Sequence, residues 1–193
     1  VVQNEPPPLI PRETIFGNPD RTMARISPDG AHAAAAAQVE AGTAAGYRPL
    51  WPAGRFSGGL MTLSRLPAES ADFREFAVRG LPQRIHHGDY HGRKGHSLAR
   101  LETPAGPFSL LVTHLHARYA GPGEHDQYLG IRAAQIAELA DCIAEVEGPL
   151  VAVGDFNIRE GDPEYECLLG LTGLVDAAAV LDVRQATILS ANP

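Results

Sequence analysis

The segment at residues 127–157 constrains the fold most. Between about Gln127 and Val146 the apolar residues recur at helical spacing, and a Gly-Pro pair then stops the helix. The run LVAV at 150–153 follows, a short and wholly apolar strand that ends abruptly in polar residues. Such a helix has an apolar face to bury, so the pattern predicts that it packs on a sheet.

Further elements alternate along the chain in the same way. The predicted strands are Gly59–Leu63, Leu98–Leu101 and Phe108–Thr113, and a short helix is predicted over Pro163–Leu169. Strands alternating with helices predict a layered α/β or α+β domain. A chain of 193 residues is long enough for one such domain with a sizeable core.

The first 38 residues differ from the rest, because they are rich in proline and in turn strings such as GNPD and SPDG. We predict an N-terminal extension or fused segment at 1–38 and one domain at 39–193. Residues 9–38 resemble the N-terminus of prolyl-oligopeptidase-type serine peptidases. That family needs a G-x-S-x-G nucleophile elbow, which this sequence lacks, so no peptidase activity is expected.

Charge and composition narrow the class of protein. A net charge of -7 argues against a broad basic surface that grips nucleic acid. No run approaches the roughly 20 apolar residues of a membrane span, and the start VVQNEPPPLIPRE lacks the regions of a signal peptide. We expect a soluble chain without a transmembrane segment. Cellular location, including secretion or a periplasmic site, and oligomeric state stay open.

The most informative polar motif is GDFN, directly after the strand at 150–153. Asp155 and Asn157 lie two residues apart, so on an extended chain both point the same way. Asp offers a hard oxygen to Mg²⁺, and Asn can donate to a phosphate oxygen. A second motif, THL, ends the strand at 108–113, and its His114 is suited to stabilise charge on a phosphate.

The order of these motifs resembles the endonuclease/exonuclease/phosphatase superfamily, which includes deoxyribonucleases, inositol phosphatases and sphingomyelinases. The resemblance covers about residues 47–193: SGGLMTLSR, then KG, THL, a helix with Arg132 and Gln135 at R-x-x-Q spacing, and GDFN. It implies a two-sheet β-sandwich flanked by helices and hydrolysis of a phosphodiester by an activated water, with Mg²⁺ (or Mn²⁺) as cofactor.

Carried over by position, the resemblance makes His114, Asp155 and Asn157 the catalytic residues, with Asp155 also a metal ligand. Glu5, in the string VVQNE, matches the metal-binding glutamate of the family. Arg132 and Gln135 are expected to be structural. The family's first strand and its C-terminal Ser-Asp-His motif have no counterpart in this sequence, so a catalytically incomplete remnant or a phosphate- or metal-binding module is an open alternative.

A second alternative is a zinc hydrolase, because His86, His87, His91 and His96 crowd one loop. His116, which forms an H-x-H pair with His114, is a further candidate for a metal site.

The phosphodiester substrate itself stays open among a small molecule, a lipid headgroup and nucleic acid. The acidic charge favours the sphingomyelinase-like branch over a duplex nuclease. Candidate cations at the rim of the site are Arg84, Arg93, Lys94 and Arg118.

Overall fold

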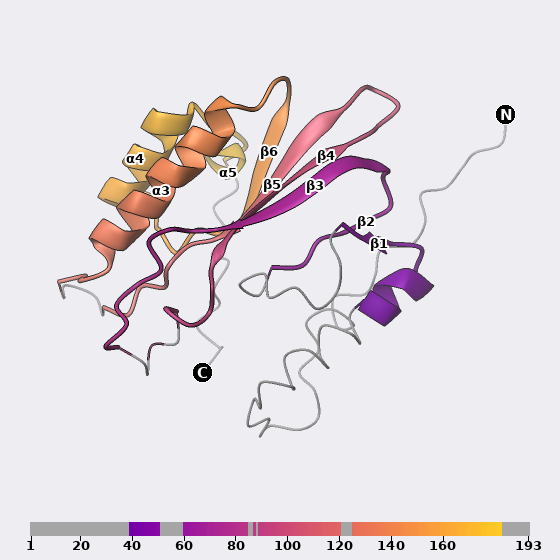
Figure 1. Cartoon of the computed structure of the whole chain (residues 1–193). Coiled ribbons are helices and arrows are strands. Elements are labelled where there is room, and N and C mark those ends of the chain that lie inside the picture. The colour runs from indigo at the N-terminus through magenta and orange to yellow at the C-terminus, as the bar shows by residue number, and fades with distance from the viewer. Residues whose placement is uncertain (1–38, 51–59, 85–86, 88, 121–124, 183–193) are drawn as a thin grey trace, which may run out of the picture. The chain divides into compact units, whose positions relative to one another are not determined.

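The computed structural model describes residues 39–50, 60–84, 87, 89–120 and 125–182. Its elements are β1 (Arg48–Pro49), β2 (Leu63–Ser64), β3 (Ala68–Glu75), β4 (Gly95–Leu101), β5 (Phe108–His114), α3 (Leu129–Ala144), β6 (Leu150–Asp155), α4 (Pro163–Thr172) and α5 (Ala177–Val180) (Figure 1). Residues 39–44 are also helical. The mixed α/β class is therefore confirmed. The proposed extension at 1–38 lies outside the described residues.

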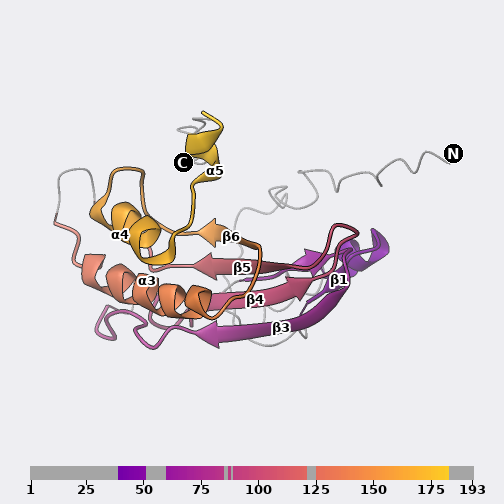
Figure 2. The same cartoon turned by 90° about the horizontal axis from the view of Figure 1, so that it is seen from above.

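The strands β3 to β6 form one four-stranded sheet in the order β3-β4-β5-β6, and β1 pairs with β2 separately. β3, β4 and β5 pair antiparallel. β6 runs parallel to β5, because the N–H of Ser109 donates to the carbonyl of Pro149 and that of Leu115 to the carbonyl of Asp155, both over 2.9 Å. Figure 2 shows the arrows of β5 and β6 pointing the same way. Two chain segments therefore end side by side.

β3 is the strand that the sequence does not predict. Its sequence AESADFRE is mostly polar, and its residues are exposed or half-buried because it forms one end of the sheet. Charged side chains are typical of such edge strands. Gly95 lets β4 approach β3 closely, since a Cβ there would lie 2.1 Å from the carbonyl oxygen of Arg74. Conversely, residues 60–62, predicted as strand, are not in a strand.

The chain divides into two compact units, one holding the strands and the other holding Phe76–Lys94, His114–Glu147 and the residues from Asp155 onward. In the second unit α3 and α4 lie side by side (Figures 1 and 2). The predicted helix is confirmed, but its buried stripe includes two polar residues, Arg132 and Gln135, beside Ile136, Leu139 and Cys142. Ile131 and Ile143, two of the apolar residues that recur at helical spacing, are only half-buried.

Candidate active site

The candidate site lies where β5 and β6 end. Gly154, the residue before the end of β6, allows this arrangement: its φ is +140°, and a Cβ would lie 2.0 Å from the carbonyl oxygen of Thr113. Any other residue would clash with β5 and be strained in its backbone. The glycine of GDFN therefore serves the close approach of two strands.

His114 and Asp155 are the terminal residues of these strands. The Nε2 atom of His114 lies 3.8 Å from Oδ2 of Asp155, and their side chains are 30% and 65% exposed. The distance is too long for a direct hydrogen bond but short enough for electrostatic attraction when the imidazole is protonated. Both side chains are accessible to a ligand, so the structure brings two of the sequence-predicted residues together.

Asn157 joins them through a turn. It has a left-handed φ of 52°, a conformation that Asn tolerates better than most residues, so the expectation of an extended chain through 157 is wrong. Its backbone N–H donates to Oδ1 of Asp155 and its Nδ2 to the carbonyl of Leu115, both over 3.0 Å. The amide NH₂ has two hydrogens, which leaves one for a further acceptor.

Lys94, of the KG motif, contacts the same stretch of backbone as Asn157. Its ammonium donates to the carbonyl of Leu115 over 2.8 Å and pairs with Asp89 over 3.0 Å, and the residue is only 5% exposed. Burial lowers the pKa of Lys94, while Asp89 and Asp155 act in the opposite direction. Lys94 is therefore not a cation at the rim of a site, contrary to the sequence-based expectation. Its role is to fix the residue between the two histidines.

His116 is buried, at 1% exposure, and does not join His114 in a metal site. Its Nδ1 lies 2.9 Å from the carbonyl of Ala117 and 3.3 Å from Asp89, and its ring stacks on Tyr128 at 4.2 Å. Burial lowers its pKa, so the neutral imidazole is favoured. The H-x-H pair thus divides into one accessible and one structural histidine.

Arg132 and Gln135 are structural, as predicted. Arg132 is fully buried and binds the carboxylates of Asp126 and Glu164. Gln135 accepts from the backbone N–H of His116 over 2.8 Å and donates to the carbonyl of Val78 over 2.9 Å. The R-x-x-Q pair therefore holds the loop that follows β5 onto α3.

Arg118, another cation expected at the rim of the site, is also paired with carboxylates. It binds Asp162 over 2.6 Å and lies 3.7 Å from Asp126. The side chain of Asp89 pairs with Lys94, lies 3.3 Å from His116 and accepts from the N–H of Ala117. It was not among the predicted residues, because nothing in the string HHGDYH distinguishes a buried carboxylate from an exposed one.

The described residues can be searched for side chains that could hold a metal ion. Within them no group of three or more His, Cys, Asp or Glu side chains is placed to hold an ion. Glu5 and His86 lie outside the described residues, so those two predictions are not tested. The described histidines at 87, 91 and 96 do not come together in a group that could hold a metal ion.

A comparison with models of known protein families finds no match. Curated relatives do match. The chain is 31% identical over 143 residues to the inositol phosphosphingolipids phospholipase C of Saccharomyces cerevisiae, covering 72% of this chain and 30% of that protein. It is 33% identical over 138 residues to human sphingomyelin phosphodiesterase 2, covering 67% and 32%. The chain therefore spans about a third of the length of these relatives.

Solved structures agree on the fold. A β-hairpin deletion mutant of the Staphylococcus aureus beta toxin matches with a TM-score of 0.50 and 23% identity, over 62% of this chain and 41% of the toxin. The sphingomyelinase C of Streptomyces griseocarneus matches with the same TM-score and 20% identity. Together with the relatives in sequence and the ordered motifs, these matches confirm the resemblance of this chain to the endonuclease/exonuclease/phosphatase superfamily.

Proposed function

We propose that this chain is part of a Mg²⁺-dependent hydrolase that cleaves a phosphodiester bond in the headgroup of a sphingolipid. The observation that carries the proposal is the accessible pair of His114 and Asp155 at the ends of two parallel strands, 3.8 Å apart. The names of the relatives, a phospholipase C for inositol phosphosphingolipids and a sphingomyelin phosphodiesterase, support the substrate class.

The donor set fits Mg²⁺. This ion takes one or two protein carboxylates and fills its other positions with water and substrate phosphate oxygens. Asp155 offers a carboxylate that is 65% exposed and held by the N–H of Asn157. Glu5 stays the predicted second ligand. When bound, such an ion polarises a phosphoryl oxygen and favours deprotonation of water.

The side chains of this chain then have distinct tasks. His114 is proposed to donate from its imidazole to a phosphate oxygen, which stabilises the charge that develops there. Asn157 is proposed to direct its remaining amide hydrogen to the same phosphate. Lys94 and Asn157 both donate to the carbonyl of Leu115. These two hydrogen bonds restrain the backbone next to His114 and so help to hold its orientation.

Hydrolysis of bis(p-nitrophenyl) phosphate and of sphingomyelin in mixed micelles, each with Mg²⁺ or Mn²⁺, tests the proposal. We expect activity that EDTA and Asp155→Ala both abolish and that His91→Ala, a change at an exposed histidine, leaves intact. A folded protein that hydrolyses neither compound, or equal rates for wild type and Asp155→Ala, would overturn it. Cleavage of the first compound alone would reject the sphingolipid substrate and keep the reaction.

A further inference from the structure

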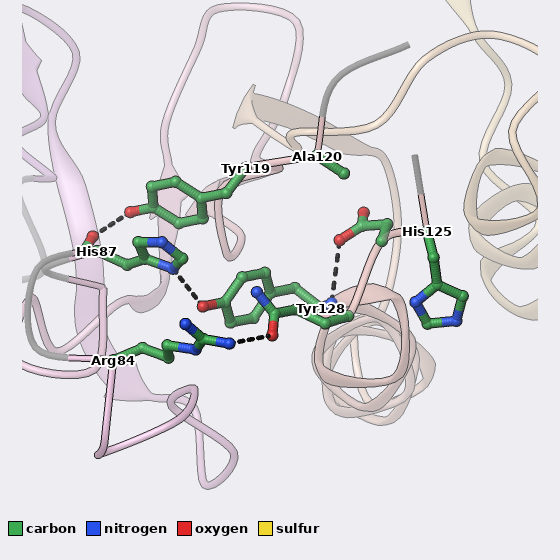
Figure 3. Close-up of a pocket in the computed structure, with 8 residues that line it drawn as sticks. Arg84, His87, Tyr119, Ala120, His125 and Tyr128 are labelled. Atoms are coloured by element: carbon green, nitrogen blue, oxygen red, sulfur yellow. Dashed lines mark hydrogen bonds between the residues drawn. The ribbon is translucent and has the colours of Figure 1, made fainter. Parts of the chain in front are cut away.

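A pocket of about 200 Å³ opens on the second unit, and neither His114 nor Asp155 is among the residues that line it. Arg84 and His125 lie on opposite sides of it, with rings of His87, Tyr119 and Tyr128 beside Arg84 (Figure 3). The catalytic proposal uses none of these residues.

The aromatic wall of the pocket is fixed before any ligand arrives. The rings of His87 and Tyr119 stack at 3.9 Å with only 12° between their planes. The hydroxyl of Tyr119 donates to the carbonyl of His87, and the hydroxyl of Tyr128 contacts Nδ1 of that histidine. Tyr128 is 1% exposed and stacks in turn on His116. A wall locked by stacking and hydrogen bonds loses little entropy when a ligand binds.

The one carboxylate among the lining residues, that of Asp126, is paired with arginine side chains. It accepts from Arg132 and, over 3.0 Å, from the N–H of Tyr128, and Arg118 lies 3.7 Å away. Burial acts to raise its pKa, yet the hydrogen bonds and cations outweigh burial and hold the pKa below its ordinary value. The charge of Asp126 is therefore matched by buried arginine and does not make the pocket acidic.

Three further side chains of the lining offer hydrogen-bond donors. Arg84 is exposed, and its side-chain hydrogen bond within the described residues is a long one of 3.5 Å to Oε1 of Gln127. The Nε2 of Gln127 carries two further N–H donors, and the exposed imidazole of His125 offers one in either protonation state. A cationic, donor-lined pocket is notable in a chain whose net charge is -7.

We propose that this pocket binds a phosphate group, with Arg84 as its charged ligand and Gln127 and His125 as neutral or cationic donors. A guanidinium matches the geometry of phosphate oxygens and stays charged at all relevant pH values. This phosphate is distinct from the one that His114 and Asn157 are proposed to bind, so the site does not depend on the proposed hydrolysis.

Calorimetric titration of the full chain with inorganic phosphate and with glycerol 3-phosphate, in EDTA, tests the site without turnover. We expect saturable binding that Arg84→Gln weakens about tenfold or more, because a charge-assisted hydrogen bond is lost. The matched control Arg74→Gln, at an arginine that is 61% exposed on β3, should leave the affinity unchanged. His114→Ala should leave it unchanged as well.

Three results would overturn the proposal: no binding by the wild type to either phosphate or to vesicles, equal affinity in wild type and Arg84→Gln, or loss of binding in His114→Ala. Flotation with phosphatidylcholine vesicles, with and without phosphatidic acid, distinguishes the sources of the phosphate. Recruitment that needs phosphatidic acid and Arg84 indicates a lipid headgroup, whereas binding of the soluble compounds without recruitment indicates a free phosphate ester. Active protein that fails these binding tests would reject this pocket and keep the proposed hydrolysis.

Discussion

His114 and His116 are two residues apart, yet they lie in opposite environments. His114 is 30% exposed and faces the carboxylate of Asp155 across 3.8 Å. His116 is 1% exposed, stacks on Tyr128 and contacts Asp89. His114 is therefore accessible to a ligand, whereas His116 holds the loop that follows β5 in place.

The same difference in burial separates the ionisable groups around Arg132 from those around Asp155. Around Arg132 the charges are buried and matched by Asp126 and Glu164, with only Nη1 of the arginine lacking a partner among the described residues. Around Asp155 the side chains are more accessible: the carboxylate is 65% exposed and His114, 3.8 Å away, is 30% exposed. Buried charges must be satisfied by the protein itself, whereas exposed ones keep capacity for a ligand. The buried cluster therefore stabilises the fold, and the accessible one stays the predicted site.

The largest effect on stability is expected at the buried cluster. Arg132→Ala leaves two buried carboxylates without their cation and should cost about 3–5 kcal/mol in the free energy of unfolding. Urea denaturation followed by circular dichroism measures it. The control Arg74→Ala removes an exposed pair with Asp72 and should cost about 0.5 kcal/mol or less. Similar losses in both variants would show that the buried network has no special weight.

A substitution at His114, beside Asp155, should change the catalytic rate and leave stability nearly unchanged. His114→Ala should lower the rate of phosphodiester hydrolysis by about 10²–10³-fold, because a donor to the developing charge is lost. Its unfolding free energy should change by about 0.5 kcal/mol or less, as is usual for accessible residues. Steady-state kinetics and urea denaturation of the same samples check both values. A variant that loses stability and rate together would place His114 with the structural residues.

Gly154→Ala probes the contact that brings the two strand ends together. The new Cβ would lie 2.0 Å from the carbonyl oxygen of Thr113 at a φ of +140°. We expect a cost of about 1–3 kcal/mol from strain, together with reduced activity. Gly148→Ala is the matched control, since φ there is +85° but no atom lies within 4 Å. If both substitutions cost the same, backbone conformation alone matters and the close approach does not.

The smallest effect is a pH dependence from His116. Burial places its folded-state pKa below the ordinary 6.5, although the Ala117 carbonyl and Asp89 act to raise it and Lys94 and Arg132 act to lower it. The unfolded chain thus takes up a proton near pH 6.5, while the folded protein does so only at lower pH. Stability should therefore fall as pH drops below about 6.5, by at most about 1.4 kcal/mol per pH unit. Unfolding free energies of wild type and His116→Gln between pH 5 and 7.5 measure this slope. An unchanged slope in the variant would contradict the assignment.

Prediction from sequence succeeded where a local pattern had one interpretation. The apolar runs that become β5 and β6 and the amphipathic stretch that becomes α3 were found, because each pattern matches the period of its element. The strand β3 was missed because an edge strand need not be apolar. His114 and Asp155 were identified as site candidates from motif order, yet nothing in that order separates them from His116 or Lys94 in burial.

The sequence by itself determined the helix and strands of the segment at 108–155 and the residue types at the strand ends, since these depend on neighbours a few positions away. The tertiary structure decided which of the polar groups are buried. Lys94, which the sequence presents as one more cation, lies 5% exposed against Asp89 and the carbonyl of Leu115, because the loop that follows β5 folds over it. Burial depends on contacts between residues far apart in the chain, which no local pattern encodes.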